Sequence, residues 1–195
     1  MSRLGRRVVL GAAAFVGLFA PLVLNPADWL GGVVIYLSLS IVLFSRSLRS
    51  SRESLLAAMI SALAAVVCVI IYSYYFILPG GETDSEEFFR LGVQHSRSFT
   101  LPEYSGGSSA FAIILTLFMM IGGPSKLLAH SIGCLGTVLS FIAYARLRGL
   151  LYGRTSISPV LMLVFGLTPS ALFLRTAVLR EAWQSFFFIS AVYYF

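Results

Sequence analysis

The chain has 195 residues, of which 58% are hydrophobic and 11% are charged. Soluble domains are roughly 45–50% apolar and about 25% charged, so this composition excludes a water-soluble globular fold. Lysines and arginines number 14 against 8 acidic residues, a net charge of +6, but most of these cations flank apolar runs and indicate membrane topology, not a nucleic-acid surface. The long apolar runs do not alternate in polarity as barrel strands do, so we expect an all-α, polytopic transmembrane helical bundle.

Seven apolar runs follow one another along the chain: Val8–Leu24, Trp29–Phe44, Ser54–Leu78, Ala110–Ile121, Leu127–Ala145, Ser158–Leu174 and Ala182–Phe195. A helical span needs about 20 apolar residues and at least roughly 17. Ala110–Ile121 is shorter than this and is followed by Gly122-Gly123-Pro124. We therefore expect about six spans plus one interfacial or re-entrant helix.

The first two spans are expected to form a hairpin whose basic ends face the cytoplasm. The turn between them, Asn25–Asp28, carries only one charge, Asp28, which is in a position to cap the second helix. The flanking cations are Arg3, Arg6, Arg7, Arg46, Arg49 and Arg52. Because cytoplasmic loops are enriched in Lys and Arg, we place the N-terminus in the cytoplasm and assign residues 1–53 to an N-terminal transmembrane hairpin.

Residues 54–195 form the second predicted domain, a membrane core. Its first span exits to the outside and leads into the longest polar stretch of the chain, the outer loop 79–107. The basic turn Arg146–Arg154 lies in the cytoplasm, as the positive-inside rule requires, only if Ala110–Ile121 does not cross. The final run stops after 14 residues without a polar flank. We expect a fragment of a longer multi-pass protein of the plasma (inner) membrane.

The outer loop holds a cluster of acids where the third span leaves the membrane: Glu82, Asp84, Glu86 and Glu87. A carboxylate at the bilayer edge can serve as general base on an acceptor hydroxyl, or hold a divalent cation against a phosphate leaving group. The same residues fit a helix start capped by Thr83 or Asp84, with Phe88 and Phe89 resting on the membrane. Both readings stay open, because one acid can cap while another faces a substrate.

A second polar segment, Thr168–Glu181, is predicted to emerge on the same face. Pro169 can break the helix there, so that Arg175 and Arg180 line a headgroup pocket. The planar guanidinium group matches the oxygens of a phosphate. Arginines at a helix end also snorkel to lipid headgroups without a specific ligand, and this reading stays open too.

Other reactive residue types have simpler interpretations. His95 and His130 lack a recognisable partner at local spacing, so we expect them to be solvated or packed. Cys68 and Cys134 lie in apolar runs without the spacing of metal ligands, so we expect both to be packing residues.

Several of these features occur in an order that resembles the GT-C superfamily of multi-span glycosyltransferases, such as the protein mannosyltransferase-like family. Asp84–Gly92 looks like the family's first outer-loop aspartate followed by an aromatic and a small residue. A surface helix ending in Gly, Ala110–Gly123, comes next, and then a span that leads into the Gly-Arg-containing turn Arg146–Arg154. The next span closes with Pro169-Ser170 and is followed by Leu179-Arg180-Glu181, which resembles the second outer loop. The resemblance covers residues 70–195.

The resemblance implies transfer of a sugar from a polyprenyl-phosphate donor to an acceptor glycan, lipid or protein at the extracytoplasmic face. Asp84 would be the catalytic base and Glu181 would take the second acidic position, assisting the acceptor or a divalent cation. Glu86 and Glu87 would contribute to substrate binding, and Arg175 or Arg180 would steady the phosphate.

Three other functions remain open. Members of the family commonly have one span before the first outer loop, whereas this chain is expected to have three. An O-antigen-type polysaccharide polymerase, which is also built from many helices, is therefore an alternative. A transporter would be expected to carry charges inside its spans, whereas most charges here lie at membrane edges. A non-catalytic membrane subunit would look the same in sequence.

Overall fold

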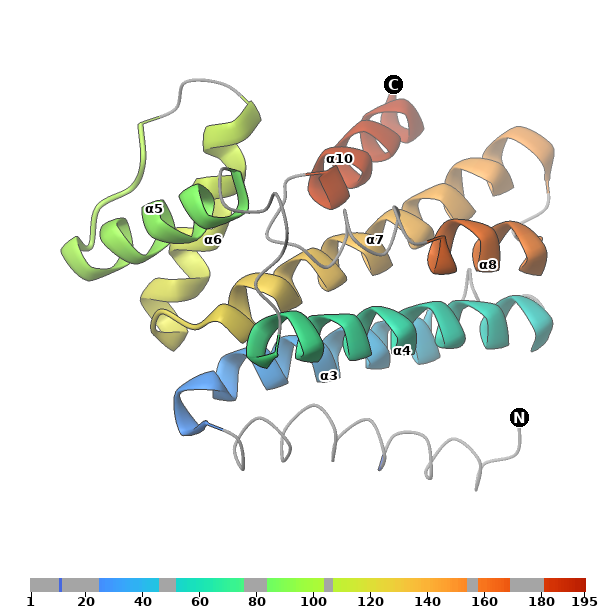
Figure 1. Cartoon of the computed structure of the whole chain (residues 1–195). Helices are drawn as coiled ribbons and strands as arrows, with labels where there is room; N and C mark the ends of the chain where they lie inside the picture. Colours follow the sequence, from blue (N-terminus) through green and yellow to red (C-terminus); the bar gives the residue numbers. More distant parts are fainter. Residues whose placement is uncertain are drawn as a thin grey trace.

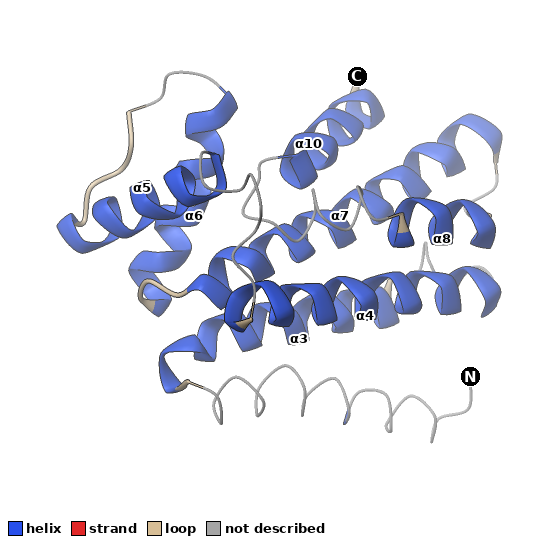
Figure 2. Ribbon diagram, in the orientation of Figure 1, coloured by secondary structure: helices blue, strands red, loops and turns tan. Residues whose placement is uncertain are grey.

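The computed structural model describes Gly11 and residues 25–45, 52–75, 84–103, 107–153, 158–168 and 181–195. These residues form helices joined by turns, and no strand occurs among them (Figure 2). The elements are the 3-10 turn η2 (Pro26–Asp28) and the helices α3 (Trp29–Phe44), α4 (Arg52–Tyr74), α5 (Asp84–Ser98), α6 (Gly107–Gly122), α7 (Lys126–Tyr152), α8 (Pro159–Leu167) and α10 (Glu181–Tyr194). The predicted all-α class is confirmed for this part of the chain.

Among the described residues, three stretches are long and apolar enough to cross a bilayer: Pro26–Phe44, Arg52–Tyr74 and Lys126–Tyr152. In a bilayer core only a helix or a closed barrel satisfies its backbone hydrogen bonds internally, so apolar runs of this length fold locally into helices. The α7 helix has defined ends. The Ser125 hydroxyl accepts a hydrogen bond from Leu128 N at 3.1 Å, and Gly153 closes the helix with a φ of 63°, the left-handed conformation that suits glycine.

The long helices run side by side, and α5 and α6 lie at one end of them (Figure 1). At that end α3 and α7 begin and α4 ends, and we call it the Asp28 end. The opposite end, where α7 finishes, is called the Arg148 end. In Figure 1, α6 runs across the direction of the long helices. Its apolar part, Ser109–Gly122, is shorter than a membrane span, as expected from the sequence.

Two hydrophobic clusters hold the helices together. The main cluster joins α3, α4, α7 and α8, with Leu39, Ala58, Val69 and Cys134 fully buried. The second cluster joins α3, α6, α7 and α10 through Val34, Phe111, Leu128, Ile132 and Trp183, among others, and the α5 residues Phe88 and Phe89 pack against it. The second cluster lies toward the Asp28 end and attaches α5, α6 and α10 to the bundle.

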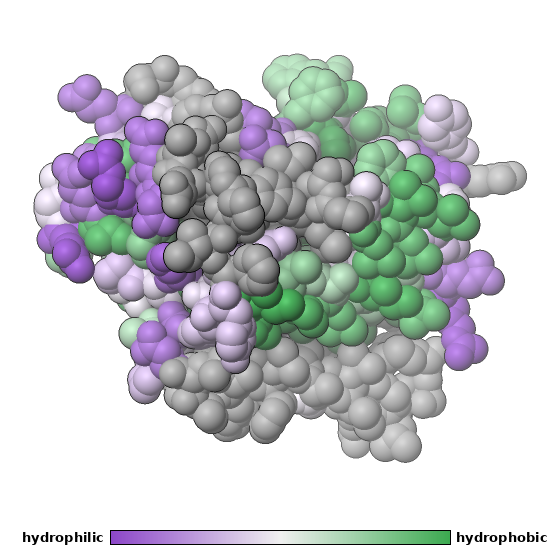
Figure 3. Space-filling view, viewed as in Figure 1, coloured by the Kyte–Doolittle hydropathy of each residue, from purple (hydrophilic) through white to green (hydrophobic). Residues whose placement is uncertain are grey.

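The outer surface of α4 and α8 is apolar between two polar ends. Figure 3 shows hydrophobic residues gathered over these helices, with hydrophilic residues at the α5 side and at the opposite side. Along α4 the exposed apolar residues are Leu56, Ile60, Leu63, Val67 and Ile71. Their spacing of three and four residues places them on one helix face. Such a face is stable against lipid but not against water.

The predicted spans agree with the structure to different extents. The second predicted span, Trp29–Phe44, coincides with α3. The run Ser158–Leu174 is described only as far as Thr168, and α8 covers nine residues of it. The first run, Val8–Leu24, lies outside the described residues apart from Gly11. Three candidate spans are therefore shown, and the number of six stays a prediction, as does the domain division after residue 53.

Candidate functional site

A buried carboxylate lies at the Asp28 end, where three helices meet. Asp28 is 4% exposed. One of its oxygens, Oδ2, accepts a hydrogen bond from the hydroxyl of Tyr74 at the end of α4, and the other, Oδ1, accepts one from the hydroxyl of Ser125 at the start of α7. These hydrogen bonds connect α3 to α4 and to α7.

Asp28 occupies the N-cap position of α3, as predicted, but its side chain makes no capping hydrogen bond. Both carboxylate oxygens are engaged by partners on other helices instead. The capping function falls to Asn25, whose Oδ1 accepts from Ala27 N at 3.1 Å in the turn before α3. A buried charge is costly without such partners, so Asp28 favours the arrangement in which α4 and α7 both reach it.

The acid-rich segment predicted as the main site forms α5, which begins at Asp84. The helix start expected there is confirmed. Glu86 and Glu87 are exposed. Phe88 and Phe89 do not rest on the membrane alone but pack on the second cluster, where the ring of Phe88 meets that of Phe111 edge-on at 5.3 Å. The side chain of Asp84, and Thr83 as a whole, lie outside what the structure describes.

The packing of α5 on α6 depends on Gly92. A Cβ at this position would lie 2.9 Å from the sulfur of Met119 and 3.1 Å from Cγ of Leu115, closer than ordinary contacts. The apolar face of α5 is therefore held against α6, and Glu86 and Glu87 are left exposed.

Glu181 begins α10 and is half-buried. Its Oε2 is buried and has no hydrogen-bond partner within the described part of the chain. Two residues further on, Trp183 belongs to the second cluster and donates from Nε1 to Ile132 O at 3.1 Å. The cluster thus holds the first turns of both α5 and α10.

The predicted phosphate-binding arginines, Arg175 and Arg180, lie outside the described residues. Whether they meet Asp84 therefore stays a prediction. The described residues give no support to the predicted binding of a divalent cation. No three His, Cys, Asp or Glu side chains among them lie close enough together to hold an ion.

The two histidines both have neighbours that local spacing did not reveal. His95 Nδ1 lies 2.9 Å from Oγ1 of Thr100, five residues later, which corrects the expectation that it has no local partner. Thr100 is brought there because Phe99 adopts a φ of 51° and turns the chain back at the end of α5. His130 is buried, with its ring 6.4 Å from the ring of Tyr72, in agreement with a packing role.

Sequence reasoning missed the Asp28 cluster because its hydroxyl donors are 46 and 97 residues away in the chain. One signal was available. Asp28 is the single charged residue in the short turn between two apolar runs, and an acid in such a place is expected to find a partner.

Comparisons with other proteins add no relative: no protein-family model matches the chain, and neither does a curated protein or a solved structure. The class therefore rests on the fold. Three long apolar helices, an apolar belt and polar ends indicate a helical membrane protein.

Proposed function

We propose that this chain is a membrane glycosyltransferase of the GT-C type, which moves a sugar from a polyprenyl-phosphate donor to an acceptor hydroxyl at the extracytoplasmic face. The observation that supports the proposal is the second cluster, which attaches the acid-rich start of α5 to the Asp28 end of the bundle. Glu181 begins α10 farther along α7, where Ser140 donates a hydrogen bond to the carbonyl of Ala182 at 3.0 Å. The exposed acids Glu86 and Glu87 thus lie at a polar end of the apolar bundle, as an interfacial enzyme requires.

In the proposed reaction, the carboxylate of Asp84 takes the proton of the acceptor hydroxyl as its oxygen attacks the anomeric carbon of the sugar. The bond from that carbon to the phosphate oxygen breaks, and polyprenyl phosphate leaves. Arg175 or Arg180 balances the charge on the leaving phosphate. Glu86 and Glu87 contact the substrates, and Glu181 assists the acceptor or a divalent cation.

The Asp28 cluster would support this chemistry indirectly. It ties the end of α4, which precedes the outer loop, to the start of α7, which follows α6. The two ends of the segment that carries α5 and α6 are thus fixed next to each other, which limits how far the acids can move.

The test measures sugar transfer by the chain in liposomes. The liposomes contain radiolabelled polyprenyl-phosphate hexoses and an acceptor mixture extracted from the membrane in which the protein naturally occurs. We expect Asp84→Asn to lose roughly 100-fold or more of the activity, the usual contribution of a general base. Glu103→Gln, which removes another acid of the outer loop, is the matched control and should retain activity. Unchanged transfer by Asp84→Asn contradicts the assignment, and no transfer by the unaltered chain favours the non-catalytic subunit.

A further inference from the structure

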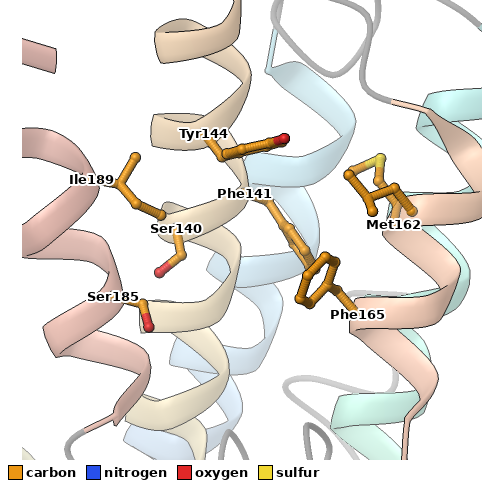
Figure 4. Close-up of a pocket in the computed structure, with 8 residues that line it drawn as sticks. Ser140, Phe141, Tyr144, Met162, Phe165, Ser185 and Ile189 are labelled. Atoms are coloured by element: carbon orange, nitrogen blue, oxygen red, sulfur yellow. The ribbon is translucent and has the colours of Figure 1, made fainter. Parts of the chain in front are cut away.

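A trough runs along the side of the bundle, from one helical turn after Glu181 on α10 toward the Arg148 end. Figure 4 shows Ser140 and Tyr144 on α7, flanked by residues of α10 on one side and of α8 on the other. Because α8 packs mainly on α4 and α10 packs mainly on α7, no described helix fills the space over α7 between them. The cavity measures about 290 Å³, and its lining residues are Ser140, Phe141, Tyr144, Leu161, Met162, Phe165, Ser185 and Ile189.

The trough offers a mainly apolar surface, although two serines and a tyrosine are among the residues that line it. Ser140 Oγ donates to the carbonyls of Gly136 and Ala182 at 2.8 and 3.0 Å, and Ser185 Oγ donates to the carbonyl of Glu181 at 2.8 Å. The single O–H donor of each serine is thus engaged by backbone carbonyls, while the small size of serine keeps the trough wide. Such a surface suits a hydrocarbon chain and not a sugar.

The trough leads toward the headgroup region at the Arg148 end. A helix rises about 1.5 Å per residue, so about 20 residues cover the ~30 Å hydrocarbon core. Counted from the start of α7 at Lys126, this distance ends close to Arg146. The trough residue Tyr144 is therefore still within the hydrocarbon, and Arg146 and Arg148 reach the depth of the lipid phosphates.

Arg148 is placed to meet a headgroup above the trough. It follows Tyr144 by one helical turn and lies on the same face of α7. Its side chain is half-buried, and it forms no ion pair or hydrogen bond within the described part of the chain. Helical side chains lean toward the N-terminus of their helix, which directs Arg148 back toward the trough.

We propose that the trough between α7, α8 and α10 binds one acyl chain of an anionic phospholipid, with the lipid phosphate at Arg148. The apolar lining accommodates the acyl chain, and the Arg148 guanidinium, which has no partner within the described part of the chain, binds the negative phosphate. This site is separate from the proposed glycosyl transfer, and neither inference depends on the other.

The test uses the full chain in phosphatidylcholine vesicles that contain a trace of photoactivatable lipid, either phosphatidylglycerol or phosphatidylcholine, with the label near the middle of one acyl chain. We expect the phosphatidylglycerol probe to label peptides that contain Tyr144, Phe165 or Ile189 in preference to the other probe. Ser185→Phe, which fills the trough, should reduce this labelling several-fold. Arg148→Gln should lower the preference for phosphatidylglycerol about fivefold and leave labelling by phosphatidylcholine unchanged.

Two matched variants control for indirect effects. Ala191→Phe adds the same ring at an exposed position of α10 outside the trough, and Arg52→Gln removes an exposed arginine at the same end of the bundle. Both variants should be labelled by the two lipid probes to the same extent as the unaltered chain. Circular dichroism checks that every variant keeps its helix content. Equal labelling of the unaltered chain by the two probes, labelling unaffected by Ser185→Phe, or a cross-linked dimer of the chain at these residues would overturn the proposal.

Discussion

Asp28 shows how a single residue fixes the relative positions of three helices. Its carboxylate is buried and receives hydrogen bonds from Tyr74 and Ser125. Ser125 has a second task, because the same hydroxyl oxygen accepts from Leu128 N and caps α7. The start of α7 is therefore coupled to the end of α4 through one acidic side chain. Loss of the acid would leave the buried hydroxyl of Ser125 and the partly buried Tyr74 without this acceptor.

Replacement of Asp28 by Ala should lower the free energy of unfolding by about 1–2 kcal/mol, given the modest strength of polar contacts in membrane proteins. Asp28→Asn retains an acceptor oxygen and should cost less. Unfolding in mixed detergent micelles by titration with a denaturing detergent measures the change. Asn25→Ala, which removes only an exposed hydrogen bond in the same turn, is the control, and equal stability of Asp28→Ala and Asn25→Ala would show that the cluster is not stabilising.

At the scale of elements, α5 and α6 form a unit that is attached to the bundle at a few close contacts. One of them is between the end of α6 and the start of α3, where a Cβ on Gly122 would lie 2.6 Å from Cβ of Leu30. Only glycine permits this approach, because a Cβ atom is bonded directly to the backbone and cannot rotate away from its neighbour. The next residue, Gly123, has a φ of 80° and turns the chain toward α7.

Gly122→Ala should therefore loosen α5 and α6 and leave the long helices intact. Overpacking of this kind costs about 1–3 kcal/mol, which should raise amide exchange of both helices about fivefold or more. Hydrogen–deuterium exchange with mass spectrometry resolves the two regions. Ile121→Ala changes a neighbouring side chain that is 74% exposed and should not alter exchange, whereas unchanged exchange in Gly122→Ala would contradict this account.

At the scale of the whole molecule, polar residues gather at two ends of an apolar bundle. The outer loop and α5 belong to the Asp28 end, and the arginines that follow the middle of α7 belong to the Arg148 end. The positive-inside rule predicts that the Arg148 end faces the cytoplasm. The proposed glycosyl transfer requires the same orientation, because its acids must meet substrates outside.

Single cysteines at the two ends test this orientation. After Cys68 and Cys134 are replaced by Ala, a membrane-impermeant maleimide applied to intact cells should label Glu103→Cys and leave Tyr152→Cys unlabelled. Both natural residues are exposed, so labelling of the two after permeabilisation is the control. The reverse pattern, or labelling of both positions in intact cells, would refute the topology and with it the proposed function.

The class of this protein, the approximate position of its described long helices and a helix beginning near Asp84 could all be predicted from the sequence. These features are local, because an apolar run of sufficient length must satisfy its own backbone hydrogen bonds in lipid, and a helix is the simplest structure that does so. The bounds of α3 were predictable to the residue for that reason.

The tertiary structure alone decided which helix ends meet and where space remains between them. The partners of Asp28, the cluster that joins α5 to α10 and the trough beside Arg148 all depend on side chains far apart in the chain. An apolar helix packs against several neighbours almost equally well, since its surface is apolar all round. A few glycines, serines and one carboxylate select one of these packing arrangements. Their contacts form only when the helices have come together, so the sequence does not reveal them.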